Sequence, residues 1–187
     1  MTRYSLPQMA LHWLIALLIF TAFGLIWYFG SVEITSAATF KLKGSLIAWH
    51  KWAGISVLIL VLVRLAVRFK QGAPVPLPGQ PAWQLKVAAG THHLLYLLMI
   101  ALPFIGWLMT SAKGYPVVLF NLVQLPDLVA KNEELGKVLK DVHEIMAYTL
   151  LAIVALHAAA ALKHHFIDRD ATLKRMLPSC KKGENQA

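Results

Sequence analysis

The chain is poor in cysteine, with Cys180 as the single thiol among 187 residues. One cysteine excludes an intramolecular disulfide and a cluster of thiolate metal ligands, and it excludes the CxxCH motif that attaches haem covalently. Cys180 lies in a polar C-terminal stretch and needs no role of its own. A cofactor, if this protein binds one, would therefore be held without a covalent bond.

Charge is also scarce, since 14% of the residues are charged and 58% are hydrophobic. A soluble domain of this length exposes too much surface for so few charges, so the composition indicates an integral membrane protein. Four apolar stretches are long enough to cross a hydrocarbon core of about 30 Å. We therefore expect an all-α fold, with one domain over residues 1–187 formed by a four-helix transmembrane bundle. The expected helices are residues 9–29, 46–67, 87–110 and 138–162, followed by a basic tail at 163–187.

Acidic residues are fewer than basic ones, and the formal net charge is +9. If the N-terminus is inside, eleven Lys and Arg residues fall on the inner side and seven on the outer side. This bias favours both termini in the cytoplasm. We expect lipid headgroups, and no nucleic acid, as partners of the basic tail. The outer loop, residues 111–137, includes a stretch of apolar and polar residues at 117–135. We expect this stretch to form a short helix on the membrane surface.

Two histidines, His143 and His157, lie fourteen residues apart in the last apolar stretch. On a helix this spacing is a rise of about 21 Å, and it returns to within roughly 40° of the same face. One helix would therefore present two imidazoles at two depths in the membrane. Ionisable groups inside a bilayer are costly, and several of them at matched depths indicate a function.

Two other apolar stretches carry histidines at matching depths. His12 lies near the cytoplasmic surface, as His157 does, and His50 lies near the periplasmic surface, as His143 does. The expected pairs are therefore His50 with His143 and His12 with His157. Each pair comes from two different helices, as a haem held between two axial imidazoles requires. Such a haem has both axial positions filled, so it exchanges electrons instead of activating oxygen.

His92 and His93 compete for the inner haem, because they begin the third stretch at a depth close to that of His12. Adjacent helical residues diverge by about 100°, so at most one of them could face a given haem. Either could also contact a quinone or a haem propionate, or serve packing alone. His164 and His165 fall at the membrane edge, where we expect them to be solvated.

Basic side chains lie close to both expected haem positions. Lys51 and Lys113 are on the outer side, where they could draw a small anion toward the outer haem. Arg64 and Arg68 end the second stretch, where they could hold the propionates of the inner haem. Contact with lipid headgroups is the alternative for all four side chains.

Several short motifs surround these histidines in a familiar order, and the run from His157 to His165, HAAAALKHH, is the most specific of them. The chain resembles the bacterial cytochrome b561 family, a branch of the di-haem membrane cytochromes b that includes subunits of hydrogenase and formate dehydrogenase. The resemblance covers essentially the full length. Further motifs that carry it are Leu11-His12-Trp13-Leu14, Trp49-His50-Lys51, Tyr96-Leu97-Leu98 and Val142-His143-Glu144.

The resemblance implies a multi-pass protein of the bacterial inner membrane with two b-type haems, whose family ligands fall on His12, His50, His143 and His157. It also implies electron exchange with ubiquinone and, from close relatives, oxidation of superoxide. We therefore expect a superoxide:ubiquinone oxidoreductase. The alternative is an electron-relay subunit that serves a partner dehydrogenase, and a homo-oligomer is possible in either case. A non-redox transporter or scaffold is the third possibility.

Overall fold

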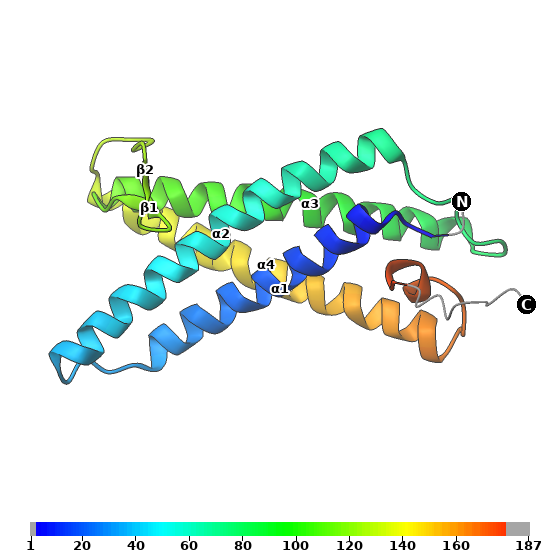
Figure 1. Ribbon diagram of the computed structural model, residues 1–187, viewed down its shortest axis with the longest axis horizontal. Helices are drawn as coiled ribbons and strands as arrows, with labels where there is room; N and C mark the ends of the chain where they lie inside the picture. The colour runs from blue at the N-terminus through cyan, green and yellow to red at the C-terminus, as the bar shows by residue number, and fades with distance from the viewer. Residues whose placement is uncertain (1–2, 179–187) are drawn as a thin grey trace, which may run out of the picture.

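The computed structural model describes residues 3–178 and contains four long helices (Figure 1). Each helix is long and apolar enough to cross a membrane, so the prediction of a four-helix membrane bundle is confirmed. The helices are α1 (Leu6–Ser31), α2 (Ala37–Gln71), α3 (Ala82–Ala112) and α4 (Glu133–Phe166).

Every helix extends beyond the apolar stretch that predicted it, and polar side chains cap the N-terminal ends of α1, α2 and α4. The Ser36 hydroxyl accepts a hydrogen bond from the Thr39 amide at 3.2 Å, and the Asn132 side chain accepts one from the Leu135 amide at 3.0 Å. Gly72 ends α2 with a φ of 69°, a conformation that favours glycine. Hydropathy alone therefore underestimates helix length at both ends.

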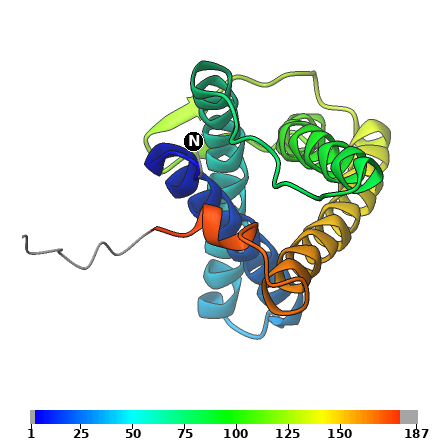
Figure 2. The same ribbon diagram turned by 90° about the vertical axis from the view of Figure 1, so that its right-hand side faces the viewer.

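The helices form two antiparallel hairpins, α1 with α2 and α3 with α4, which cross through contacts between α2 and α3 (Figure 1). We call the end that carries Leu6, Gln71, Ala82 and Phe166 the terminal end, and Figure 2 views the bundle from that side. The opposite end is the hairpin end. A buried apolar core joins all four helices at mid-length, with Ile15, Ile19, Phe23, Val57, Val61, Leu95, Leu98 and Leu150.

A β-hairpin occupies the loop between α3 and α4, so the expected surface helix at 117–135 is wrong. Strands β1 (Val117–Leu119) and β2 (Val123–Leu125) pair antiparallel, and the turn between them holds Phe120 and Asn121 at positive φ. β-Branched valines favour strands over helices. The Trp52 indole on α2 donates to the Val118 carbonyl at 2.7 Å, which docks the hairpin on the bundle.

The basic tail is folded back against the bundle as far as the structure describes it. After α4 ends, the 3₁₀ helix η1 (Leu173–Met176) lies at the terminal end. The Trp13 indole donates to the Met176 carbonyl at 2.8 Å, and the Arg175 guanidinium donates to the Val75 carbonyl at 2.7 Å. Both chain ends therefore lie on one side of the bundle. Lys181 and Lys182 of the predicted tail lie outside the described residues.

Candidate haem-binding site

The first histidine pair lies in the half of the bundle nearer the hairpin end. His50 of α2 and His143 of α4 have ring centres 6.3 Å apart, with the ring planes at 75°. The Nδ1 atom of His50 lies 2.9 Å from the Ala22 carbonyl of α1. A carbonyl can only accept, so this contact requires the proton on Nδ1 and leaves Nε2 free to coordinate a metal. The structure thus brings together the two residues that matched depth had paired.

His143 lies in an unusually close contact with α3. A Cβ atom built on Gly106 would come within 2.9 Å of the His143 ring, so glycine leaves the space that this ring occupies. The Nδ1 atom of His143 is buried and lacks a hydrogen-bond partner within residues 3–178. Buried polar atoms are normally paired, so this imidazole has unused bonding capacity beside His50.

The second pair lies in the half of the bundle nearer the terminal end. His12 of α1 and His157 of α4 have ring centres 6.1 Å apart, with the ring planes at 68°. The ring of His92 of α3 also approaches His157, at 5.2 Å between centres. His12 and His157 are half-buried, whereas His92 and His93 are exposed. The structure therefore brings three histidines together here, and of these His92 is more exposed than His12 and His157.

The spacing of the two predicted pairs fits a haem iron between each pair. Two imidazoles on opposite sides of a metal have ring centres about 6 Å apart, because each metal–nitrogen bond is about 2 Å and each nitrogen lies about 1 Å from its ring centre. The separations of 6.3 Å and 6.1 Å match this geometry. The 5.2 Å between His92 and His157 is too short for it.

Each histidine pair joins two helices that do not pack closely against each other. Among residues 3–178, the closely packed helix pairs are α1 with α2, α3 with α4 and α2 with α3. Both histidine pairs join α4 to a helix outside these close pairs. Gly54 lies one turn beyond His50, and a Cβ atom built there would have no heavy atom within 4 Å. The residues present therefore fit two bis-histidine haems.

The four basic residues predicted near the haems occupy both ends of the bundle. The Lys51 ammonium lies 3.4 Å from the Pro116 carbonyl at the hairpin end. Lys113 ends α3 at the same end of the bundle. At the other end, the Arg64 guanidinium donates to the Tyr96 hydroxyl at 3.2 Å and to the Gln8 carbonyl. Arg64 therefore links α1, α2 and α3, while Arg68 lines a cavity beside it.

His164 is not simply solvated, contrary to the expectation from its position at the membrane edge. Its Nδ1 atom lies 2.7 Å from an Asp170 oxygen and 3.1 Å from an Asp168 oxygen. The Lys163 ammonium lies 2.7 Å from the same Asp168 carboxylate. These contacts fold the chain back where α4 ends, a structural role that charge spacing alone does not reveal.

Two contributors to the histidine pairs were missed by sequence reasoning. Gly106 accommodates the His143 ring, and the Ala22 backbone carbonyl orients His50. Gly106 could have been noticed in the sequence, because an isolated glycine inside a helix often marks a close approach of another group to its backbone. The role of the Ala22 carbonyl could not be found in the sequence, because every residue has a backbone carbonyl.

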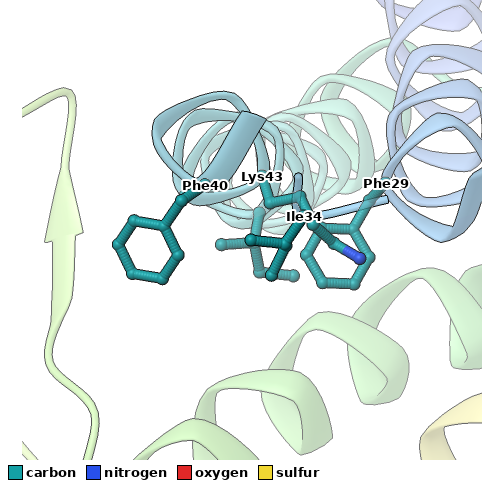
Figure 3. A pocket seen from close by; sticks show the side chains of 6 residues that line it. Phe29, Ile34, Phe40 and Lys43 are labelled. Atoms are coloured by element: carbon teal, nitrogen blue, oxygen red, sulfur yellow. The ribbon is translucent and has the colours of Figure 1, made fainter. Parts of the chain in front are cut away.

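A separate hollow lies where α1 meets α2 at the hairpin end (Figure 3). Its volume is about 240 Å³, and its lining includes Phe29, Ile34 and Phe40. The Lys43 ammonium lies 4.5 Å from the centre of the Phe29 ring and 3.0 Å from the Val32 carbonyl, to which it donates. Lys43 thus stabilises the corner, and neither histidine pair lines this hollow.

Residues 3–179 match the family described as prokaryotic cytochrome b561. The chain belongs to this family. Cytochrome b561 homolog 1 of Escherichia coli (strain K12) is 33% identical over 180 residues, 95% of this chain and 98% of that protein. Cytochrome b561 homolog 2 of the same strain is 32% identical over 176 residues, 94% of this chain and 91% of that protein. A Yersinia pestis protein named Probable superoxide oxidase CybB is 32% identical over 176 residues, 94% of this chain and 96% of that protein.

Membership of the cytochrome b561 family confirms the resemblance seen in the histidine motifs. As a member of the family, this protein is a multi-pass bacterial membrane cytochrome that binds b-type haem and transfers electrons. The non-redox transporter or scaffold considered from the sequence is therefore wrong.

Proposed function

We propose that this cytochrome b561 holds two b-type haems and is a superoxide:ubiquinone oxidoreductase of the bacterial inner membrane. His50 and His143 hold one haem near the periplasm, and His12 and His157 hold the other near the cytoplasm. The observation that carries the proposal is the presence of two histidine pairs in one bundle, each at the separation that one iron needs. The similarity to the protein named a probable superoxide oxidase supports the choice of electron donor.

The haems, when bound, supply one-electron transfer through their edges. The surrounding side chains select what reaches them. Lys51 and Lys113 lie at the hairpin end, on the side of His50 and His143. Their positive charge raises the local concentration of a small anion such as superoxide. Superoxide loses its electron by outer-sphere transfer and leaves as oxygen, so this half-reaction needs neither a bond to the protein nor a general acid.

The overall reaction balances with one quinone for two superoxide anions. Each superoxide gives one electron and becomes oxygen, while ubiquinone takes two electrons and two protons to become ubiquinol. Both termini are cytoplasmic in this proposal, as the distribution of Lys and Arg favours. The oxidation then takes place on the periplasmic side, while the quinone is reduced within the membrane.

Stopped-flow spectroscopy of the purified protein tests the proposal. We expect superoxide to reduce the haems, and we expect ubiquinone to accelerate steady-state superoxide consumption. Replacing Lys51 and Lys113 together by Gln should lower the second-order rate about tenfold at low ionic strength, because steering by charge is lost. Lys41→Gln serves as the matched control, since this exposed lysine lies near the N-terminal end of α2.

Two outcomes would contradict the proposal. Superoxide consumption that does not respond to ubiquinone would exclude a superoxide:ubiquinone oxidoreductase. Haems that resist superoxide, but are reduced rapidly once a co-purifying dehydrogenase receives its substrate, would identify the protein as a relay subunit instead.

A further inference from the structure

The pair of His12 and His157 joins two helices that lack close contact with each other. His12 belongs to α1 and His157 to α4, and within residues 3–178 these two helices are not among the closely packed pairs. Both histidines lie toward the terminal end, because His12 follows the start of α1 at Leu6 closely and His157 precedes the end of α4 at Phe166. Direct packing of α1 on α4 therefore does not fix the distance between the two imidazoles.

The chain that follows α4 bridges the two helices at this end. The contact of the His164 Nδ1 atom with an Asp170 oxygen, at 2.7 Å, turns the chain back where α4 ends. The 3₁₀ helix η1 then packs against α4 and reaches α1, where the Trp13 indole donates to the Met176 carbonyl at 2.8 Å. Figure 2 looks onto this end and shows η1 between α1 and α4. We call residues 167–176 the strap.

The strap is fixed by contacts with three further parts of the chain. The Tyr4 amide, just before α1, donates to the Arg175 carbonyl at 3.3 Å. The Arg175 guanidinium donates to the Val75 carbonyl at 2.7 Å, in the connection between α2 and α3. With the bond from Trp13 on α1 itself, these contacts hold η1 in place relative to both α1 and α4.

Trp13 connects the strap to a proposed haem ligand. Its ring centre lies 5.2 Å from that of His12, with the ring planes at 74°. Trp13 is 43% exposed, so its orientation depends on the contact with His12 and on the hydrogen bond to Met176 more than on burial. Groups that contact a metal ligand and are themselves held by hydrogen bonds orient that ligand.

We propose that Trp13 is a positioning residue for the inner haem, and that the strap sets the separation of His12 and His157 through it. The connected contacts run from His12 to Trp13, across the hydrogen bond to Met176, and through the strap to α4 and His157. The strap keeps both imidazoles at coordinating distance, so that neither leaves the iron readily. This proposal rests on the proposed function, because it requires a haem between His12 and His157.

Carbon monoxide tests the positioning role, because it binds a ferrous bis-histidine haem only after one axial histidine has left the iron. Trp13→Phe keeps an aromatic ring beside His12 and removes the N–H that donates to Met176. We expect it to accelerate CO binding to the inner haem about tenfold, since the loss of a group that supports a metal ligand weakens such sites by about this factor. His50→Ala, which should retain the inner haem alone, assigns the kinetic phases to the two haems.

Trp27→Phe is the matched control for Trp13→Phe. Trp27 lies on the same helix toward the hairpin end and is similarly exposed, at 55%. We expect this variant to bind CO at the wild-type rate. Equal acceleration at both haems in Trp13→Phe would indicate a general loosening of the bundle and would overturn the positioning role.

Truncation separates the strap from the ring contact. A stop codon after Thr172 removes η1, and a stop codon after Pro178 retains it and serves as the control. Loss of η1 should accelerate CO binding as much as Trp13→Phe does, and the two changes together should have no further effect, because both break the same connection. If Trp13→Phe keeps its full effect in the protein without η1, Trp13 acts on His12 directly and the strap has no part in it.

Haem stoichiometry distinguishes failure of the strap from failure of the proposed function. One haem per wild-type chain, or two haems retained in His12→Ala, would overturn the proposed inner haem site itself. If the wild type binds two haems and His12→Ala loses one, but Trp13→Phe and Trp27→Phe bind CO alike, only the role of Trp13 and the strap is wrong.

Discussion

At the scale of single residues, the two proposed haem sites differ in what orients their histidines. His50 is held by the Ala22 carbonyl, while the His143 ring lies against Gly106. At the other site, His157 faces both His12 and the exposed His92. The site at His50 and His143 thus depends on backbone positions, whereas at the other site the separation of 6.1 Å favours His12 over His92 as the partner of His157.

Single histidine substitutions should separate the two sites. His50→Ala should lose the outer haem and His12→Ala the inner one, because each removes one of two axial ligands. Pyridine haemochrome assays per chain should then show half the haem of the wild type in each variant. His92→Ala serves as the control and should retain all of it. Loss of the inner haem from His92→Ala, with retention in His12→Ala, would reverse the assignment.

Gly106→Ala should weaken the outer haem selectively. The added methyl group would lie 2.9 Å from Cε1 of His143 and must displace the imidazole. Disturbing the groups that support a metal ligand typically costs about 10–100-fold in affinity, which haem titration of the apoprotein measures. Gly24→Ala is the matched control, because its methyl group meets no atom within 4 Å. Equal haem affinity in the two variants would show that Gly106 does not position His143.

At the scale of elements, α4 has the largest share in the proposed chemistry, because it contributes one histidine to each pair. Its C-terminal end is held by a polar cluster. Asp170 accepts hydrogen bonds from the Thr172 amide and from His164, both at 2.7 Å. Through this turn, η1 returns to the N-terminal end of α1, where Tyr4 and Trp13 donate to its carbonyls.

The turn after α4 should loosen in acid. Burial alone would raise the pKa of the Asp170 carboxyl, but hydrogen bonds from Thr172 and His164 outweigh it and lower that pKa below its ordinary 3.8. A carboxylate whose pKa is lower in the folded state stabilises that state above its unfolded pKa, and this contribution is lost as the pH falls through the folded value.

Pepsin, which is active in acid, provides the measurement for this turn. Cleavage between Phe166 and Leu177, normalised to a synthetic peptide of the same sequence, should increase as the pH falls below about 4. Asp170→Asn should be cleaved rapidly at every pH at which pepsin is active, and Asp127→Asn in the loop between α3 and α4 should behave as the wild type. A pH-independent rate in the wild type would show that Asp170 does not hold the turn.

At the scale of the whole molecule, the bundle has one end with both chain termini and one end with the β-hairpin (Figures 1 and 2). Lys51, Lys113 and the pair of His50 and His143 lie toward the hairpin end, and the cavity at Arg68 lies toward the terminal end. In the proposed function, superoxide would approach from the hairpin end, away from the end that carries both termini.

Thiol labelling in spheroplasts should reveal this orientation. Asn121→Cys, made in a Cys180→Ser background, places a thiol on the exposed turn of the β-hairpin. A membrane-impermeant maleimide should label it from the periplasm, because the proposed orientation places the hairpin end on that side. Native Cys180 should react only after the membrane is permeabilised. The reverse pattern would place both termini in the periplasm and invert the proposed superoxide site.

The sequence by itself determined the membrane class, the four helices and the residues at paired depths. These features follow from hydropathy and helical spacing, which are local properties of the chain. Depth in a bilayer depends mainly on position along a spanning helix. His50 could therefore be paired with His143, and His12 with His157, from the sequence alone. The family resemblance could also be stated in advance, since short motifs surround each of these histidines.

Only the tertiary structure decided how the helices cross and what lies between them. The contact of Gly106 with His143, the approach of His92 to His157 and the cavity at Arg68 each join positions from different helices. The β-hairpin replaced an expected helix because its valines favour strands and because Trp52, far away in sequence, docks its backbone on the bundle. Such contacts depend on the rotation and crossing of packed helices, which no local pattern encodes. The fourteen-residue spacing of His143 and His157 thus fixed two depths, while the neighbours of each imidazole were set by packing.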